Sequence, residues 1–182
     1  MYRPLILVDF QIKAEIERGT LKISPFDEAL INPSSLDVRL GHYFGVPKPT
    51  YVAIDPLDPT SFRTDMEEAG FYMLPAKSFV IGCLLEKVEY PLDITGHLKG
   101  KSSLGRLGIE NSSCAGHLDP QFAGHVTIEL FNYLDCPVKL TAGMKIGQLV
   151  FFKHVPAEHG YGDRQTSKYQ NQQAGQPSKG VN

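Results

Sequence analysis

Short runs of apolar residues, some alternating with polar positions, dominate most of the chain. Seven such runs, punctuated by Gly, Pro, Asn and Asp, occupy residues 36–40, 51–54, 71–74, 79–85, 125–131, 138–140 and 146–152. Runs of this length between turn-forming residues predict β-strands. The 13 prolines and 17 glycines are spread along the chain, which suits many turns and argues against a helical bundle or a regular βαβ succession. The pattern therefore predicts an all-β sandwich or barrel.

One short amphipathic helix is expected near the N-terminus. Its apolar positions Ile12, Ala14 and Ile16 are interleaved with the charged positions Lys13, Glu15, Glu17 and Arg18. Gly19 follows and is placed to end the helix, because glycine readily adopts the left-handed conformation found after helix C-termini.

The periodic pattern stops at about Pro156, and the remainder of the chain is polar. Such a segment cannot bury enough apolar area to order itself. It is either a frayed tail or a flap that orders on a ligand, for which Tyr161, Lys168, Tyr169 and Gln172 supply suitable groups.

Composition narrows the class of protein. The 182 residues are about the length of one domain, with 42% hydrophobic and 21% charged residues, as in a globular protein. A formal net charge of −2 and the absence of a basic stripe argue against a nucleic-acid partner. No apolar stretch approaches the roughly 20 residues of a membrane span, and no signal peptide is recognisable, so we expect a cytoplasmic location. The three widely spaced cysteines predict reduced thiols.

Residues 100–106, GKSSLGR, combine two serines with two cations between glycines. If Ser102 begins a single helical turn, then Ser102, Ser103 and Arg106 share a face. Exposed backbone N–H groups at such a turn, together with Lys101 and Arg106, favour an anion such as phosphate. The alternative interpretation is a capped turn with a solvated polar face.

Glu129 lies in the middle of the predicted strand HVTIELF. Alternation puts Val126, Ile128 and Leu130 on one face and Thr127, Glu129 and Phe131 on the other. Glu129 is therefore either solvent-facing or lodged in a semi-apolar pocket, where desolvation would raise its pKa and suit it to transfer protons.

Two further polar residues precede that strand. Asp119 either caps its own turn or belongs to the same site, and His117, two positions earlier, could face that site as well.

Other chemistries find little support. The six histidines form no His-x-Glu or His-x-x-x-His pair and no Cys-x-x-Cys occurs, so zinc is not expected. A Gly-x-Ser-x-Gly elbow is also missing, and covalent acyl chemistry is not indicated.

Five ordered segments resemble the dCTP deaminase group of the trimeric dUTPase superfamily: SSLDVRLG, GKSSLGRLGI, AGHLDPQFAGHVTIEL, AGMKIGQLV and SKYQNQQ. The resemblance implies a distorted jelly-roll β-barrel over residues 1–182, with residues 157–182 as a flexible segment that closes over nucleotide. It also implies a homotrimer with sites at subunit interfaces and zinc-independent hydrolytic deamination of dCTP.

The resemblance implies a role for each of several residues. Glu129 would shuttle protons between the attacking water and the leaving ammonia, Ser102 and the backbone of Ala115 would hold that water, and Arg106 would keep Glu129 ionised. Asp119 would grip the 3'-hydroxyl of the deoxyribose, and the triphosphate would bind as its Mg²⁺ complex. The nucleotide-binding set implied is Lys101, Ser102, Ser103, Arg106, Asp119, Thr127, Glu129, Gln148, Tyr161, Lys168 and Gln172.

The segment around Gly116 resembles the bifunctional branch of that group, which carries dCTP through to dUMP and diphosphate. Deaminases that release dUTP often have a His-Arg pair where this chain has Gly116 and His117, and His117 matches neither branch. Gln148 also resembles the bifunctional enzymes, whereas Gln121 replaces a frequent glycine. In a bifunctional enzyme, Asp119 would also position the water that attacks the α-phosphorus.

Three alternatives remain: a deaminase that stops at dUTP, a dUTPase without deamination, and a nucleotide-sensing module without turnover. The resemblance also makes dTTP a candidate feedback inhibitor.

Overall fold

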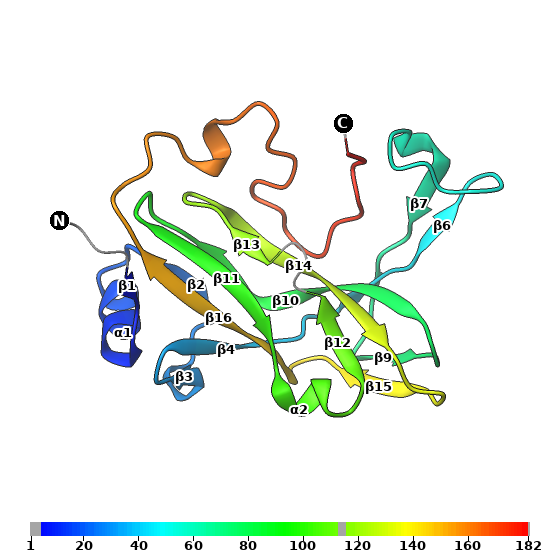
Figure 1. The fold of residues 1–182 in the computed structure, drawn as a ribbon, viewed down its shortest axis with the longest axis horizontal. Helices are drawn as coiled ribbons and strands as arrows, with labels where there is room; N and C mark the ends of the chain where they lie inside the picture. The colour runs from blue at the N-terminus through cyan, green and yellow to red at the C-terminus, as the bar shows by residue number, and fades with distance from the viewer. Residues whose placement is uncertain (1–4, 113–115, 182) are drawn as a thin grey trace.

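Two antiparallel sheets form the centre of the fold, in a computed structural model that describes residues 5–112 and 116–181. The larger sheet has the strand order β13-β11-β16-β4-β3, and β1 also pairs with β16 (Figure 1). Its strands are β1 (Leu5–Ile6), β3 (Ile31–Asn32), β4 (Ser35–Arg39), β11 (Ile94–Gly100), β13 (His117–Leu118) and β16 (Lys145–Lys153).

The second sheet has the order β12-β14-β10-β2. Its strands are β2 (Lys22–Ser24), β10 (Phe79–Glu89), β12 (Ile109–Ser112) and β14 (Ala123–Asn132). Strands β10 and β14 are antiparallel, with Ile81 opposite Glu129. This register matters for the site, because it places an apolar side chain beside the mid-strand carboxyl group.

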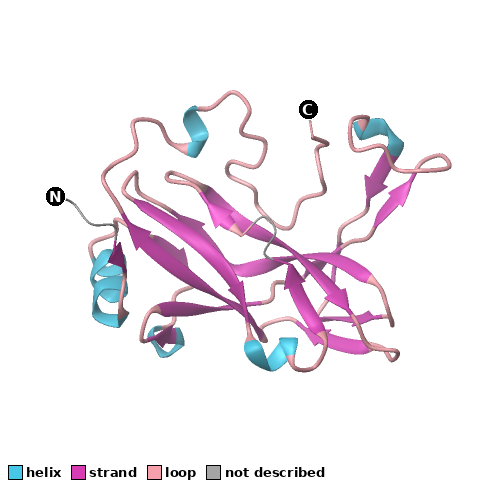
Figure 2. Ribbon diagram, in the orientation of Figure 1, coloured by secondary structure: helices cyan, strands magenta, loops and turns pink. Residues whose placement is uncertain are grey.

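Three two-stranded ribbons extend the architecture: β5 (Tyr43–Phe44) with β8 (Glu67–Glu68), β6 (Pro47–Pro49) with β7 (Phe62–Thr64), and β9 (Phe71–Leu74) with β15 (Val138–Thr141). The helical segments are short and lie at the periphery (Figure 2). They are α1 (Asp9–Glu17), α2 (Ser102–Gly105) and the 3₁₀ turns η1 (Glu28–Leu30), η2 (Pro59–Ser61) and η3 (Tyr161–Asp163). No helix in the described ranges is both long and apolar enough to cross a membrane.

The core forms where the inward faces of the strands meet. Even-numbered residues of β14, including Val126, Ile128 and Leu130, are buried, whereas odd-numbered ones are only partly covered. Leu149 and Phe151 of β16 are fully buried in the same cluster. Alternation along β14 therefore separates a core face from a face that remains available for a ligand.

The mainly β architecture with a short N-terminal helix is confirmed. Helix α1 ends before Gly19, whose φ of +70° is left-handed, as the sequence predicted. Six of the seven predicted strands are present, with boundaries shifted by a few residues.

The remaining prediction, a strand at residues 51–54, is wrong. These residues form an exposed bend between β6 and β7, where Tyr51 and Val52 are 78% and 99% exposed. The local apolar run suggested a strand, but it lies at the outer end of a ribbon and forms no ladder there.

The polar C-terminal segment packs against the sheets. It leaves β16, passes over the β13 and β14 end of the molecule and finishes beside the β6–β7 ribbon (Figure 1). Backbone hydrogen bonds fix this path: Asn171 N–H donates to Ala123, His125 N–H donates to Gln172, and Val181 N–H donates to Pro56. The segment thus forms one wall of the cavity described next.

Candidate functional site

A cavity of about 490 Å³ lies between the outward face of β14 and the C-terminal segment. Most of its exposed lining is apolar, and a few polar groups converge on it, which is typical of a small-molecule site. It is lined by Pro47, Phe79, Ile81, His117, Leu118, Asp119, Phe122, Val126, Thr127, Glu129, Tyr161, Tyr169, Gln172, Gln176 and Ser178.

Glu129 lies in a pocket, which is one of the two positions that its strand pattern allowed. Its side chain is partly buried on the cavity face of β14, opposite Ile81 of β10. Burial raises the pKa of Glu129 above its ordinary value, and a hydrogen bond from its own backbone offsets only part of that rise. A carboxyl group with a raised pKa holds its proton more readily than an ordinary glutamate, which suits a group that must both take up and return a proton.

Thr127 and Gln172 tie the C-terminal segment to β14. The Thr127 hydroxyl accepts a hydrogen bond of 3.1 Å from the Gln176 backbone N–H. Gln172 forms a parallel bridge with Gly124, and its side-chain amide donates to the carbonyl of His125. Its Oε1 atom is buried and has no hydrogen-bond partner among the described residues, although Gln172 lines the cavity.

Two tyrosines of the C-terminal segment give the cavity an aromatic wall. The Tyr161 ring meets Phe122 edge to face at 5.6 Å, and the Tyr161 backbone N–H donates to Pro120. The Tyr161 hydroxyl accepts from the backbone of Tyr169. Rings arranged in this way suit a flat ligand such as a base or a sugar edge.

Asp119 and His117 lie together at the cavity. The His117 Nε2 atom is 3.1 Å from Asp119 Oδ1. His117 therefore faces the same site as Asp119, as their spacing in the sequence suggested.

The turn at α2, away from the cavity lining, carries Ser102, Ser103 and Arg106. A single helical turn, α2, begins at Ser102, and the Arg106 N–H donates to the Ser102 carbonyl. All three residues are exposed, while Leu104 of the same turn is buried. None of the three lines the cavity of the same chain. The turn thus presents a polar, cationic face to the exterior.

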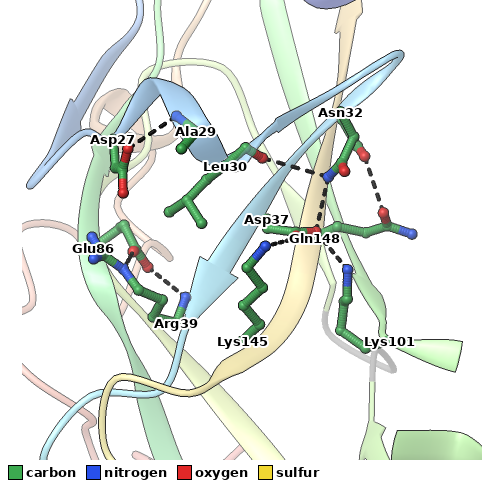
Figure 3. A network of polar contacts seen from close by, with 11 residues as sticks. Asp27, Ala29, Leu30, Asn32, Asp37, Arg39, Glu86, Lys101, Lys145 and Gln148 are labelled. Carbon is green, nitrogen blue, oxygen red and sulfur yellow. Dashed lines mark hydrogen bonds and ion pairs between the residues drawn. The ribbon is translucent and has the colours of Figure 1, made fainter. Parts of the chain in front are cut away.

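Lys101 and Gln148 belong to a polar network around Asp37 (Figure 3). Asp37 is 3% exposed and is contacted by Lys101 at 2.7 Å, Lys145 at 3.0 Å and Asn32 at 2.8 Å. Burial by itself would raise the pKa of Asp37, but the hydrogen bonds from these three side chains outweigh it and hold the pKa below its usual value. Gln148 accepts from the hydroxyl of Ser35 at 3.0 Å.

Lys168 also lies away from the cavity lining. The Lys168 ammonium donates to the carbonyl of Gly180 at 2.9 Å, within the C-terminal segment. Ala115 lies outside the described residues. Of the predicted nucleotide-binding set, the single chain therefore gathers Asp119, Thr127, Glu129, Tyr161 and Gln172 around one cavity.

Sequence reasoning did not single out the apolar part of the lining. Phe79 and Ile81 come from β10, which pairs with β14 from far away in the sequence, and Pro47 comes from β6. For Phe79 and Ile81, the sequence showed only the apolar run 79–85. Such a run predicts a strand but does not identify the strand with which it pairs.

Fold and cavity together define a β-sheet protein that binds a small ligand between apolar and aromatic walls, beside a carboxyl group suited to proton transfer. The family model described as "DCD: dCTP deaminase-like" matches residues 6–154. The chain belongs to this family.

Similar proteins align with almost all of the chain. A protein of Mycolicibacterium gilvum (strain PYR-GCK) named "dCTP deaminase, dUMP-forming" is 47% identical, over 96% of this chain and 95% of its own length. A protein of Streptomyces coelicolor with the same name is 46% identical, over 92% and 91%. The 2'-deoxycytidine 5'-triphosphate deaminase of Agrobacterium tumefaciens shares the fold, with a TM-score of 0.64 and 22% identity over 84% of this chain and 49% of that chain.

Proposed function

We propose that this protein is a hydrolase that converts dCTP to dUMP, diphosphate and ammonia. One water would replace the amino group at C4 of cytosine, and a second would break the bond between the α- and β-phosphates. The observation that carries the proposal is Glu129: a partly buried carboxyl group with a raised pKa, facing a nucleotide-sized cavity. Near-complete alignment with relatives named "dCTP deaminase, dUMP-forming" supports both steps.

In the deamination step, Glu129 takes a proton from the attacking water and passes a proton to the departing ammonia. Its raised pKa lets it act in both directions. The apolar neighbours that desolvate it also keep bulk water away from the base. Thr127 lies on the same face of β14 and offers its hydroxyl to the base or the sugar.

The exposed face of α2 completes the site from a second copy of the chain. Ser102 would hold the attacking water, Arg106 would orient Glu129, and Ser103 would contact phosphate. These groups are exposed in one chain and do not reach its own cavity lining. We therefore propose a homotrimer with its sites at the subunit interfaces, which gives each cavity one α2 face.

The triphosphate would extend toward the C-terminal segment and its cations. Mg²⁺ would arrive with the nucleotide and neutralise phosphate charge during the second hydrolysis. The ion would be held through the triphosphate, with no ligand from a protein side chain. Tyr161, Lys168 and Gln148 stay candidates for contacts with the nucleotide, and dTTP for an inhibitor that occupies the same cavity.

Product analysis by chromatography tests the proposal. The protein is incubated with dCTP or dUTP, each with and without Mg²⁺, and ammonia is measured in parallel. We expect dUMP, diphosphate and ammonia from dCTP. Accumulation of dUTP as the end product would indicate a deaminase that stops there, turnover of dUTP with inert dCTP would indicate a dUTPase, and binding without product would indicate a sensing module.

A further inference from the structure

Two histidines and an aspartate form a hydrogen-bonded chain at the cavity. His117 Nε2 lies 3.1 Å from Asp119 Oδ1, and His117 Nδ1 lies 3.1 Å from His97 Nε2. The antiparallel pairing of β11 and β13 sets His97 directly opposite His117. His97 is held in turn by Phe152 of β16, with ring centroids 4.7 Å apart.

This geometry restricts where the protons lie. The carboxylate of Asp119 only accepts, so His117 Nε2 carries a hydrogen and donates it. In neutral His117 the Nδ1 atom is then an acceptor, and His97 must donate from Nε2. If His117 gains a proton, its Nδ1–H donates to His97 instead. The hydrogen-bonded chain is then kept, with His97 as the acceptor.

We propose that His97 and His117 are positioning residues that hold the carboxylate of Asp119 in its working orientation and make the steps that use Asp119 dependent on the protonation of the pair. His117 fixes one carboxylate oxygen and leaves the other for the nucleotide or its attacking water. The inference rests on the proposed function for its effect on turnover, whereas the hydrogen-bonded chain itself rests on the contacts alone.

The groups around His97 and His117 set the pH range in which the hydrogen bond between the two rings is lost. Burial lowers the pKa of His97, and the nearby His117 and Lys99 lower it further. The charged and titratable groups facing the pair are Lys99 on β11 and Asp119 beyond β13, while β16 presents the uncharged ring of Phe152. The pair accepts one proton without losing contact, but a second makes both facing nitrogens donors. The hydrogen bond between the two histidines should therefore be lost only below the ordinary histidine pKa of about 6.5.

Substitutions at His97 separate the roles of hydrogen bonding and titration. His97→Leu removes the donor, whereas His97→Gln can place an amide N–H near the position of Nε2 and cannot titrate. The matched control is His42→Gln, at an exposed histidine that does not line the cavity. All variants leave Glu129 and Asp119 unchanged.

The first readout is the pH profile of kcat/KM with dUTP and with dCTP. We expect His97→Leu to lower kcat/KM for dUTP about 10-fold at pH 7.5, and His97→Gln to restore most of it while losing the fall on the acid side. An acid limb unchanged in both variants would overturn the proposal.

The second readout needs no turnover: the histidine ring signals of the full-length, ligand-free protein followed by NMR across pH. We expect the titration of His117 to move in His97→Leu and to stay unchanged in His42→Gln. If His117 titrates identically in the wild type and in His97→Leu, the chain does not exist in solution. Because this measurement is independent of activity, failure of the proposed enzymatic function and failure of the histidine chain give different results.

Discussion

The Lys101 ammonium lies 2.7 Å from the buried carboxylate of Asp37, and this ion pair joins the residue before α2 to strand β4. Lys145 of β16 binds the other oxygen of the same carboxylate at 3.0 Å. The turn that begins at Ser102 is therefore anchored, through the residue that precedes it, to a charge inside the fold (Figure 3). Lys101, which the sequence assigned to the nucleotide, serves this anchor in the single chain.

Asp37→Asn should destabilise the fold in a pH-dependent way. The pKa of Asp37 is lowered in the folded chain, so the carboxylate stabilises the fold above its unfolded pKa of about 3.9 and loses that effect as pH falls through the folded pKa. We expect a loss of roughly 2 kcal/mol at pH 7, because a buried partner of two lysines is removed. Chemical unfolding at pH 7 and pH 3 measures it.

The matched control is Asp135→Asn, since Asp135 is 93% exposed and its contact with Lys77 lies at the surface. Its free energy of unfolding should stay within about 0.5 kcal/mol of the wild type. Equal losses in Asp37→Asn at both pH values would contradict the ionic role of Asp37.

Glu129→Gln should abolish deamination without weakening the fold. We expect ammonia release from dCTP to fall by about 10²- to 10⁴-fold, because the proton carrier is lost while the shape is kept. Burial raises the pKa of Glu129, so ionising this group costs stability as pH rises from its unfolded pKa toward its folded pKa. The free energy of unfolding of Glu129→Gln at pH 8 should then equal or exceed that of the wild type.

Ammonia assays and denaturant titrations measure both effects, with Glu17→Gln on the exposed side of α1 as the control. Undiminished ammonia release from Glu129→Gln would remove the proton-shuttle role.

Mixing two inactive variants should restore activity if α2 completes the cavity of a neighbouring subunit. Arg106→Ala and Glu129→Gln are purified separately, mixed in mild denaturant and refolded together. Random reassembly would give about a quarter of the interfaces both native groups. The control mixture combines Asp119→Asn with Glu129→Gln, two residues that line one cavity of one chain, and should stay inactive. Absence of recovery in the first mixture would place Arg106 outside the shared site.

Gln121→Gly should stabilise the loop before β14. Gln121 has a φ of +61°, in the left-handed region that costs a non-glycine residue about 1–2 kcal/mol. Glycine removes that cost but adds unfolded-state entropy, which leaves a net gain of about 0.5 kcal/mol. Thermal unfolding compares it with Gln165→Gly, an exposed position without a left-handed φ, for which no gain is expected.

Removal of residues 157–182 should weaken nucleotide binding more than it weakens the fold. The segment supplies Tyr161, Tyr169 and Gln172 to the cavity, while the apolar core is formed by the strands. We expect KM for dCTP to rise at least about 10-fold with a small change in melting temperature. An unchanged KM would contradict the role of residues 157–182 as a closing segment.

The sequence by itself determined the features that depend on neighbours a few positions apart. Alternation with a period of two residues assigned Val126 and Ile128 to the core and Glu129 to the opposite face, and the structure has that arrangement. The end of α1 before Gly19 and the turn beginning at Ser102 follow from similarly local rules.

Tertiary structure decided what those faces meet. The pairing of Ile81 with Glu129 joins strands far apart in the chain, and the burial that raises the carboxyl pKa exists only in the folded chain. The same kind of long-range pairing sets His97 against His117, and it leaves residues 51–54 without a partner strand. Local patterns fix which way a side chain points, whereas its neighbours are set by the free energy of packing the whole chain.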